Sequence, residues 1–291
     1  MPEQTQKMTA VKEKIASGQQ LKGESKLDEA IEQYNEALKI APQNLAALNQ
    51  LASVYEQQEK WSDAASCYQK VIAFKPDTAR AYLQMGKALK QQNKLYAAVA
   101  AYQQAIELEP DLLKPFDYKQ LGDMLLQLGT PENQAVQKND AIAAYQKAVE
   151  LKSDFPASVY VALGDACQDQ QRYDEAVAAY SKAIEIKPDI NAGVHQKLGD
   201  ARLNQGYYDL AIASYRQAIQ MKPEQASYHR LVGKAFEAKG SLEEAANSYQ
   251  QAINLNPTAS GLHRLMGDVM TKLGRSVEAS QYYQRAESLK A

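Results

Sequence analysis

Residues 173–189 read YDEAVAAYSKAIEIKPD. Ala176, Tyr180 and Ala183 are spaced four and three residues apart, so they fall on one stripe of an α-helix. Alanine on that stripe lets a neighbouring helix come close, and the tyrosine fills the space beside the close approach. Pro188 cannot continue the helix, because it has no backbone N–H and its ring clashes with the preceding turn. The stretch therefore predicts the second helix of a two-helix unit.

The same pattern recurs along the chain. Four more copies have alanine, tyrosine, alanine and proline at the same spacing, and they begin at Ala30, Ala98, Ala211 and Ala245. Three further copies change or lose one position, and they begin at Ala64, Ala141 and Ala279. A glycine lies twelve residues before the first alanine in six of the eight copies, and it marks an additional helix upstream of each signature. The pattern predicts eight helix-turn-helix units.

These units begin near residues 11, 45, 79, 115, 157, 192, 226 and 260, mostly at intervals of 34 residues. The array resembles the tetratricopeptide repeat (TPR) family, whose unit is a helix-turn-helix of about 34 residues. The resemblance implies an all-α fold, a right-handed TPR superhelix or α-solenoid. Because each unit would bury its apolar face only against its neighbours, we expect residues 11–291 to form a single solenoid domain. Residues 1–10 are polar and are expected to form a flexible tail.

One unit has an irregular turn. Residues 129–140 read GTPENQAVQKND, seven residues more than the corresponding turns have. Glycine and proline among polar residues predict a protruding loop. The loop is interpreted either as a tolerated insertion or as a docking element.

Composition excludes several classes of partner. The formal net charge is -2 and no block of basic residues occurs, so the chain lacks the electrostatic footprint of a nucleic-acid-binding protein. No apolar run approaches the roughly 18 residues of a membrane span, and the first residues lack the apolar core of a signal peptide. We expect a soluble, cytoplasmic protein with no membrane insertion, in which Cys67 and Cys167 stay reduced.

Motifs for catalysis are absent from the sequence. No phosphate loop, nucleophile elbow or zinc-ligand spacing occurs. The three histidines, His195, His229 and His263, occupy equivalent positions 34 residues apart. Equivalent helices should lie on the order of 10 Å apart, whereas zinc ligands lie about 2 Å from the ion. The histidines are therefore predicted to pack, and we expect no enzyme activity, no metal site and no cofactor.

The resemblance also implies where a ligand would bind. In the family, the first helix of each unit lines the concave face, and the residue after the signature glycine points into it. The candidate peptide-groove residues are Gln50, Arg80, Gln84, Lys87, Lys119, Gln120, Asp123, Asp165, Asp169, Lys197, Asp200, Arg230, Lys234, Arg264 and Asp268. Their charges form an acid-leaning middle with positive flanks. Such banding is either an ordinary solvated surface or a means of selecting a peptide with complementary charge.

Two branches of the family offer more specific comparisons. Members that clamp the C-terminal carboxylates of chaperones use asparagines in the first two units, where this chain has Gln19 and Gln50 beside Arg80 and Gln84. Members attached to glycosyltransferases carry an asparagine ladder along the groove, of which Gln50, Gln84 and Gln120 form only a partial counterpart. Neither specialised site is predicted.

The sequence thus predicts a non-catalytic scaffold or adaptor that binds a peptide or protein segment in its concave groove. One alternative is the substrate-recognition arm of a larger enzyme of the glycosyl-, methyl- or sulfotransferase type. Another is a self-associating assembly module, a homodimer formed through the last unit, since no separate polar element follows that unit.

Overall fold

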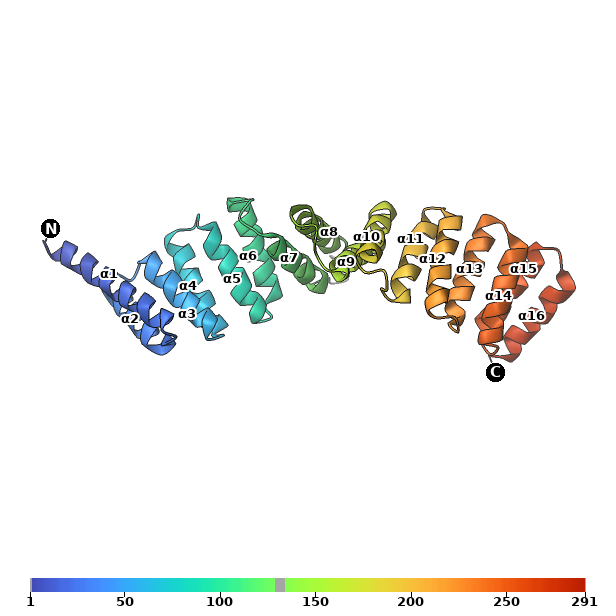
Figure 1. Cartoon of the computed structure of the whole chain (residues 1–291), viewed down its shortest axis with the longest axis horizontal. Helices are drawn as coiled ribbons and strands as arrows, with labels where there is room; N and C mark the ends of the chain where they lie inside the picture. The colour runs from blue at the N-terminus through green and yellow to red at the C-terminus, as the bar shows by residue number, and fades with distance from the viewer. Residues whose placement is uncertain (1, 129–133, 291) are drawn as a thin grey trace. The chain divides into compact units, whose positions relative to one another are not determined.

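The computed structural model describes residues 2–128 and 134–290, and these residues are folded almost wholly into α-helices (Figure 1). Two compact units divide the chain, an N-terminal unit up to Lys152 and a C-terminal unit from Ser153. In each unit the helices form consecutive antiparallel pairs, and each pair packs against the next. The predicted all-α fold of helix-turn-helix repeats is confirmed.

The helices of the N-terminal unit have the following bounds: α1 Pro2–Gly23, α2 Leu27–Ile40, α3 Leu45–Gln57, α4 Trp61–Phe74, α5 Ala79–Gln91, α6 Leu95–Leu108, α7 Pro115–Leu128 and α8 Gln134–Leu151. Those of the C-terminal unit are α9 Ala157–Asp169, α10 Tyr173–Ile186, α11 Ala192–Asn204, α12 Tyr208–Met221, α13 Ala226–Lys239, α14 Leu242–Leu255, α15 Ser260–Lys272 and α16 Ser276–Ser288. Seven of the eight predicted starting residues are the first residues of the odd-numbered helices from α3 to α15, each of which is the first helix of its pair.

The core of each pair is made by the predicted stripe. Tyr180 of α10 is 1% exposed, and the alanines on either side, Ala176 and Ala183, are fully buried. The tyrosine ring lies against Gly164 of α9, where an added Cβ atom would come within 2.5 Å of the ring. The same glycine–tyrosine contact recurs in six other pairs. In these seven pairs the ring occupies the volume that a side chain on the glycine would take, whereas the pair α3–α4 has Ala52 at this position.

Proline follows six of the eight second helices, as predicted. The backbone N–H of Lys187 still donates to the carbonyl of Ala183 at 3.0 Å, and Pro188 follows directly. Seven of the described turns between the two helices of a pair contain one residue with a positive φ angle. This residue is either glycine, as at Gly206, or a polar residue, as at Gln171. The turns are short because one left-handed residue reverses the chain direction.

Two predicted non-helical segments are helical instead. Residues 2–10, predicted to form a flexible tail, belong to α1. Residues 3–17 contain neither glycine nor proline, so nothing interrupts the helix. The first buried side chain is Val11, which is 1% exposed. Residues 134–140 of the predicted 129–140 loop begin α8, because that part of the segment also lacks glycine and proline. Residues 129–133 lie outside the described residues.

Candidate functional site

All fifteen candidate residues lie on the first helices of their pairs. We call the surface formed by these helices the first-helix face, α1, α3, α5 and α7 in the N-terminal unit and α9, α11, α13 and α15 in the C-terminal unit. None of the candidates is buried: Arg80, Asp169, Lys234 and Arg264 are exposed, and the others are half-exposed. Each unit of the chain therefore carries its own strip of polar side chains on this face.

The acids that follow four of the signature glycines accept hydrogen bonds from the tyrosines of the stripe. The hydroxyl of Tyr180 donates to Asp165 at 2.7 Å, and that of Tyr215 donates to Asp200 at 2.7 Å. Tyr145 donates to Asp123 at 2.7 Å and Tyr283 to Asp268 at 2.9 Å. Burial and then the hydrogen bond to Asp165 raise the pKa of Tyr180, so this hydroxyl keeps its proton. These four acids are therefore structural as well as surface-facing.

Other pairs use different acceptors for the same tyrosine. In two pairs a glutamate one helical turn further along accepts the bond, Glu56 from Tyr68 at 3.1 Å and Glu237 from Tyr249 at 2.7 Å. The hydroxyl of Tyr34 in the first pair is buried without a hydrogen-bond partner among the described residues. Sequence reasoning missed this link, although its signal is visible. An acid lies one or four residues after the glycine position, and the tyrosine lies sixteen residues after that position in every linked pair except the one with Gly122.

The candidate acids Asp123 and Asp165 are partly neutralised by intramolecular ion pairs. Lys119 lies 2.6 Å from Asp123 on the same helix. Lys197 of α11 binds Asp165 of α9 at 2.7 Å and so connects two successive pairs. An approaching ligand would meet less negative charge there than the sequence implied, because each of these carboxylates already faces an ammonium group.

Lys87 is engaged in the same way on α5. Its ammonium group lies 2.8 Å from the carboxylate of Asp117, which is 4% exposed. Gln120 of α7 accepts a 3.3 Å bond from the hydroxyl of Tyr102 on α6. These two candidates also join one helix pair to its neighbour.

A smaller group of candidate cations remains available. Among the residues that the structure describes, Arg80, Arg230, Lys234 and Arg264 form no hydrogen bond and no ion pair. The amides of Gln50 and Gln84 are likewise unbonded within the described part of the chain. These side chains can bind a partner without breaking an intramolecular contact.

The three histidines are packing residues on the same helices. His263 is 7% exposed and its Nε2 atom lies 2.9 Å from the carbonyl oxygen of Pro257, just before α15. His229 makes the equivalent contact to Pro223 at 3.3 Å, and Tyr160 makes it to Ser153 at 2.8 Å. Within residues 2–128 and 134–290 no group of three or more potential ligands is gathered for a metal ion. The ring at this position therefore contacts the backbone just before the first helix and stabilises the start of that helix.

Two pockets lie between α13 and α15 in the C-terminal unit. A pocket of about 490 Å³ is lined by Arg230, Lys234, Glu237, Ala238, Tyr249, Leu265 and Lys272. A second pocket of about 350 Å³ is lined by Ala226, Ser227, Arg230, Asn256, Ala259, Gly261, Leu262 and Leu265. The two share Arg230 and Leu265, so they adjoin. They contain two of the four unpaired cations.

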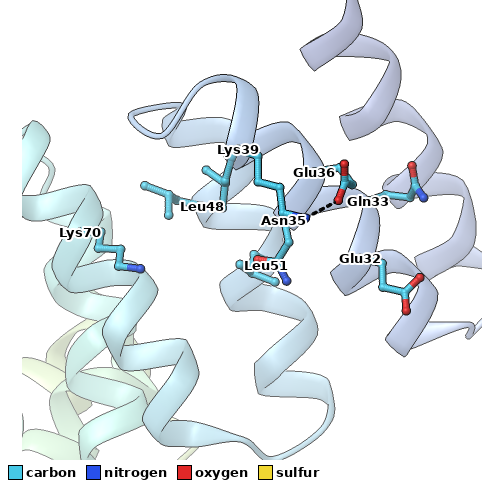
Figure 2. A pocket seen from close by; sticks show the side chains of 9 residues that line it. Glu32, Gln33, Asn35, Glu36, Lys39, Leu48, Leu51 and Lys70 are labelled. Carbon is cyan, nitrogen blue, oxygen red and sulfur yellow. Dashed lines mark hydrogen bonds and ion pairs between the residues drawn. The ribbon is translucent and has the colours of Figure 1, made fainter.

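Another pocket, in the N-terminal unit, contains none of the candidates. Figure 2 shows Glu32, Glu36 and Lys39 of α2 beside Leu48 and Leu51 of α3, with Lys70 of α4 on the other side. Its volume is about 630 Å³. Lys39 already donates to Glu36 at 2.6 Å. Two acids and two bases line this pocket, so its net charge does not favour one kind of ligand.

Comparisons with known proteins agree with this architecture. Family models described as "Tetratricopeptide repeat" match residues 197–260 and 79–112, and a model described as "TPR repeat" matches residues 18–59, 54–93 and 164–206. A search of curated proteins found no match. No helix within the described residues is long and apolar enough to cross a membrane.

Several solved structures share the fold. A MamA fragment from Desulfovibrio magneticus RS-1 is 18% identical, with a TM-score of 0.52, over 60% of this chain and 94% of that one. Another MamA structure is 20% identical, with a TM-score of 0.50, over 56% and 94% of the two chains. YrrB, described as a TPR protein with an unusual peptide-binding site, is 20% identical with a TM-score of 0.49, over 66% and 94%. At these identities the two MamA structures show a common fold.

Proposed function

Because this chain belongs to the tetratricopeptide repeat family, whose fold is a protein-interaction fold, we propose that it is a non-catalytic scaffold or adaptor that binds a peptide or protein segment. The segment binds on the concave surface made by the first helices. The observation that carries the proposal is the set of cations Arg80, Arg230, Lys234 and Arg264, which have no intramolecular hydrogen bond or ion pair among the described residues.

The remaining candidates contribute in two ways. Gln50 and Gln84 offer free amides, which bind the backbone of an extended peptide by donating and accepting hydrogen bonds. Asp123, Asp165, Asp200 and Asp268 each bond a tyrosine hydroxyl through one oxygen and stay half-exposed on the first-helix face. Asp169 adds an exposed carboxylate on α9. The ligand thus meets a surface already ordered by the core, which lowers the entropy lost on binding.

Selection from a random peptide library tests this function. The full chain is immobilised, bound peptides are selected, and the selected pool is measured against the variants Arg80→Glu and Arg264→Glu. We expect both variants to lose selected peptides. The matched control is Lys187→Glu, which makes the same change of charge at an exposed residue between α10 and α11. A pool that binds all four proteins equally, or no enrichment at all, would contradict the proposal.

Self-association is the weaker hypothesis. Ser280 and Glu287 of α16 are both exposed. The equivalent residues are apolar in the two preceding second helices: Ile212 and Ile219 in α12, and Ala246 and Ile253 in α14. Polar side chains at these positions form a poor surface for docking another helix. A homodimer through the last pair is therefore not part of the proposal.

A further inference from the structure

The two adjoining pockets between α13 and α15 form one groove with two chemically different halves. Arg230 of α13 and Leu265 of α15 line both pockets, so the halves meet at these side chains. The half near the start of the helices is lined mainly by alanine, glycine and leucine carbon atoms, among them Leu262, which is 5% exposed. The other half is lined by four charged side chains, together with Ala238, Tyr249 and Leu265.

The charges of the polar half leave an excess of positive charge. Glu237 is the one acid that lines it, and its carboxylate accepts a 2.7 Å bond from Tyr249 and a 2.7 Å bond from Lys272. The side chain of Glu237 is only 18% exposed, so a ligand has little access to it. Arg230 and Lys234 have no hydrogen bond or ion pair within the described residues, and together they give the groove two uncompensated positive charges.

An apolar half beside a positive half defines the chemistry of the occupant. An apolar side chain gains free energy when Leu262, Leu265 and the neighbouring alanines remove it from water. A carboxylate next to it in sequence would reach Arg230, whose planar guanidinium binds carboxylates through two parallel hydrogen bonds. A further acid would face the ammonium of Lys234. A neutral or basic segment would leave both cations unpaired.

We propose that this groove binds an acidic peptide segment that carries one apolar side chain, with the apolar side chain beside Leu262 and the carboxylates on Arg230 and Lys234. The inference rests on the proposed function and names the class of partner for one part of the first-helix face. Charge complementarity selects this class and speeds its association, and the apolar contact supplies affinity that salt does not screen.

A labelled synthetic peptide tests the proposal directly. The probe has one phenylalanine flanked on each side by two glutamates, and its binding to the full chain is followed by fluorescence anisotropy at low and high salt. Binding should weaken when the glutamates are replaced by lysines and when the phenylalanine is replaced by serine. It should also weaken with salt, but not vanish.

Variants of the protein locate the site. Lys234→Glu changes an exposed side chain, so the fold should be kept, which circular dichroism checks. It should raise the Kd of the probe by about fivefold or more, because the loss of an exposed ion pair contributes up to about fivefold and the new carboxylate also repels the glutamates of the probe. Arg230→Ala should weaken binding by a similar factor. Lys187→Glu is the matched control and should leave the Kd unchanged.

The outcomes separate this inference from the proposed function. Equal binding of the probe by the wild type and Lys234→Glu, or no binding at millimolar concentration, overturns the inference. If a random library still yields peptides that depend on Arg80 or Arg264, the proposed function stands while the acidic-segment inference fails. If the library yields none, the proposed function fails as well.

Discussion

Asp165 joins three helices through one carboxylate. Its Oδ1 atom accepts a 2.7 Å hydrogen bond from the hydroxyl of Tyr180 on α10, while Lys197 of α11 donates to both carboxylate oxygens at 2.8 and 2.7 Å. The surface acid is thereby tied both to the buried ring of its own pair and to the next pair. A residue of the candidate binding face is therefore also part of the link between repeats.

The tyrosine hydroxyl gives the first prediction. Tyr180→Phe removes a bond to a charged acceptor that is partly exposed, so we expect it to lower the free energy of unfolding by about 1–2 kcal/mol. Tyr34→Phe is the matched control, because the hydroxyl of Tyr34 is buried without a partner among the described residues. It should be neutral or slightly stabilising. Urea unfolding followed by circular dichroism compares the two, and equal losses would show that the bond to Asp165 contributes nothing.

The helix pairs were predictable from the sequence because their determinants are local and periodic. Ala176, Tyr180 and Ala183 share a stripe whatever surrounds them, and Pro188 ends the helix by itself. The error at residues 2–10 came from treating polar composition as evidence against helix, and the error at residues 134–140 came from extending the effect of Gly129 and Pro131 over the whole polar segment. Neither stretch beyond Pro2 contains a residue that breaks a helix.

The candidate site was predicted less completely. The register of the repeats placed Asp165 and Asp200 correctly on the first helices. The sequence does not show how far a tyrosine hydroxyl reaches across the pair, so their bonds to Tyr180 and Tyr215 were missed. Charge reversal of these acids would remove their bonds to the buried tyrosines and change ligand binding at the same time. Lys234, which is exposed and unpaired within the described residues, is therefore the better residue for testing binding.

The second prediction concerns the space beside the tyrosine. Gly164→Ala would place a Cβ atom 2.5 Å from the Tyr180 ring, which is too close for real atoms. The ring or the helix must shift, and we expect a loss of about 1–3 kcal/mol from overpacking. Gly261→Ala is the control, because its Cβ would meet nothing within 4 Å and alanine is the better helix former.

Thermal unfolding of the two glycine variants measures the contrast. Gly164→Ala should unfold at a lower temperature than the wild type, and Gly261→Ala at the same or a slightly higher one. A Gly164→Ala protein as stable as the wild type would mean that the pair tolerates a wider separation than the structure has.

The third prediction is a pH dependence. His195 is 9% exposed, and burial lowers the pKa of its imidazole below the usual value of 6.5. As the pH falls through 6.5 the unfolded chain binds a proton that the folded chain does not, so stability decreases. The contribution is complete above this pH and is lost progressively below it.

His195→Tyr should remove this contribution. Equivalent positions hold Tyr118 and Tyr160, so the fold accepts the larger ring. Urea midpoints at pH 7 and pH 5 measure the effect: the wild type should lose more stability between the two pH values than the variant. Identical losses would assign the acid sensitivity to other groups.

The last prediction concerns the outer face of α16. Two pairs before the last, Ile212 and Ile219 of α12 pack in one cluster with Tyr228, Leu231 and Val232 of α13. The equivalent residues of α14, Ala246 and Ile253, pack with Leu262 and Met266 of α15. Exposed Ser280 and Glu287 replace them on α16. These two positions therefore offer no apolar side chain to another helix.

Apolar residues at these two positions should create a surface that self-associates. We expect the double variant Ser280→Ile, Glu287→Ile to self-associate as its concentration rises, because two large apolar side chains join an exposed face whose neighbours already fit a packed helix. Sedimentation velocity over a range of concentrations measures the change. The matched control, Ser280→Thr with Glu287→Gln, keeps both positions polar and should sediment as the wild type does. If the wild type already dimerises and the isoleucine variant adds nothing, polar residues at these two positions do not limit association through α16.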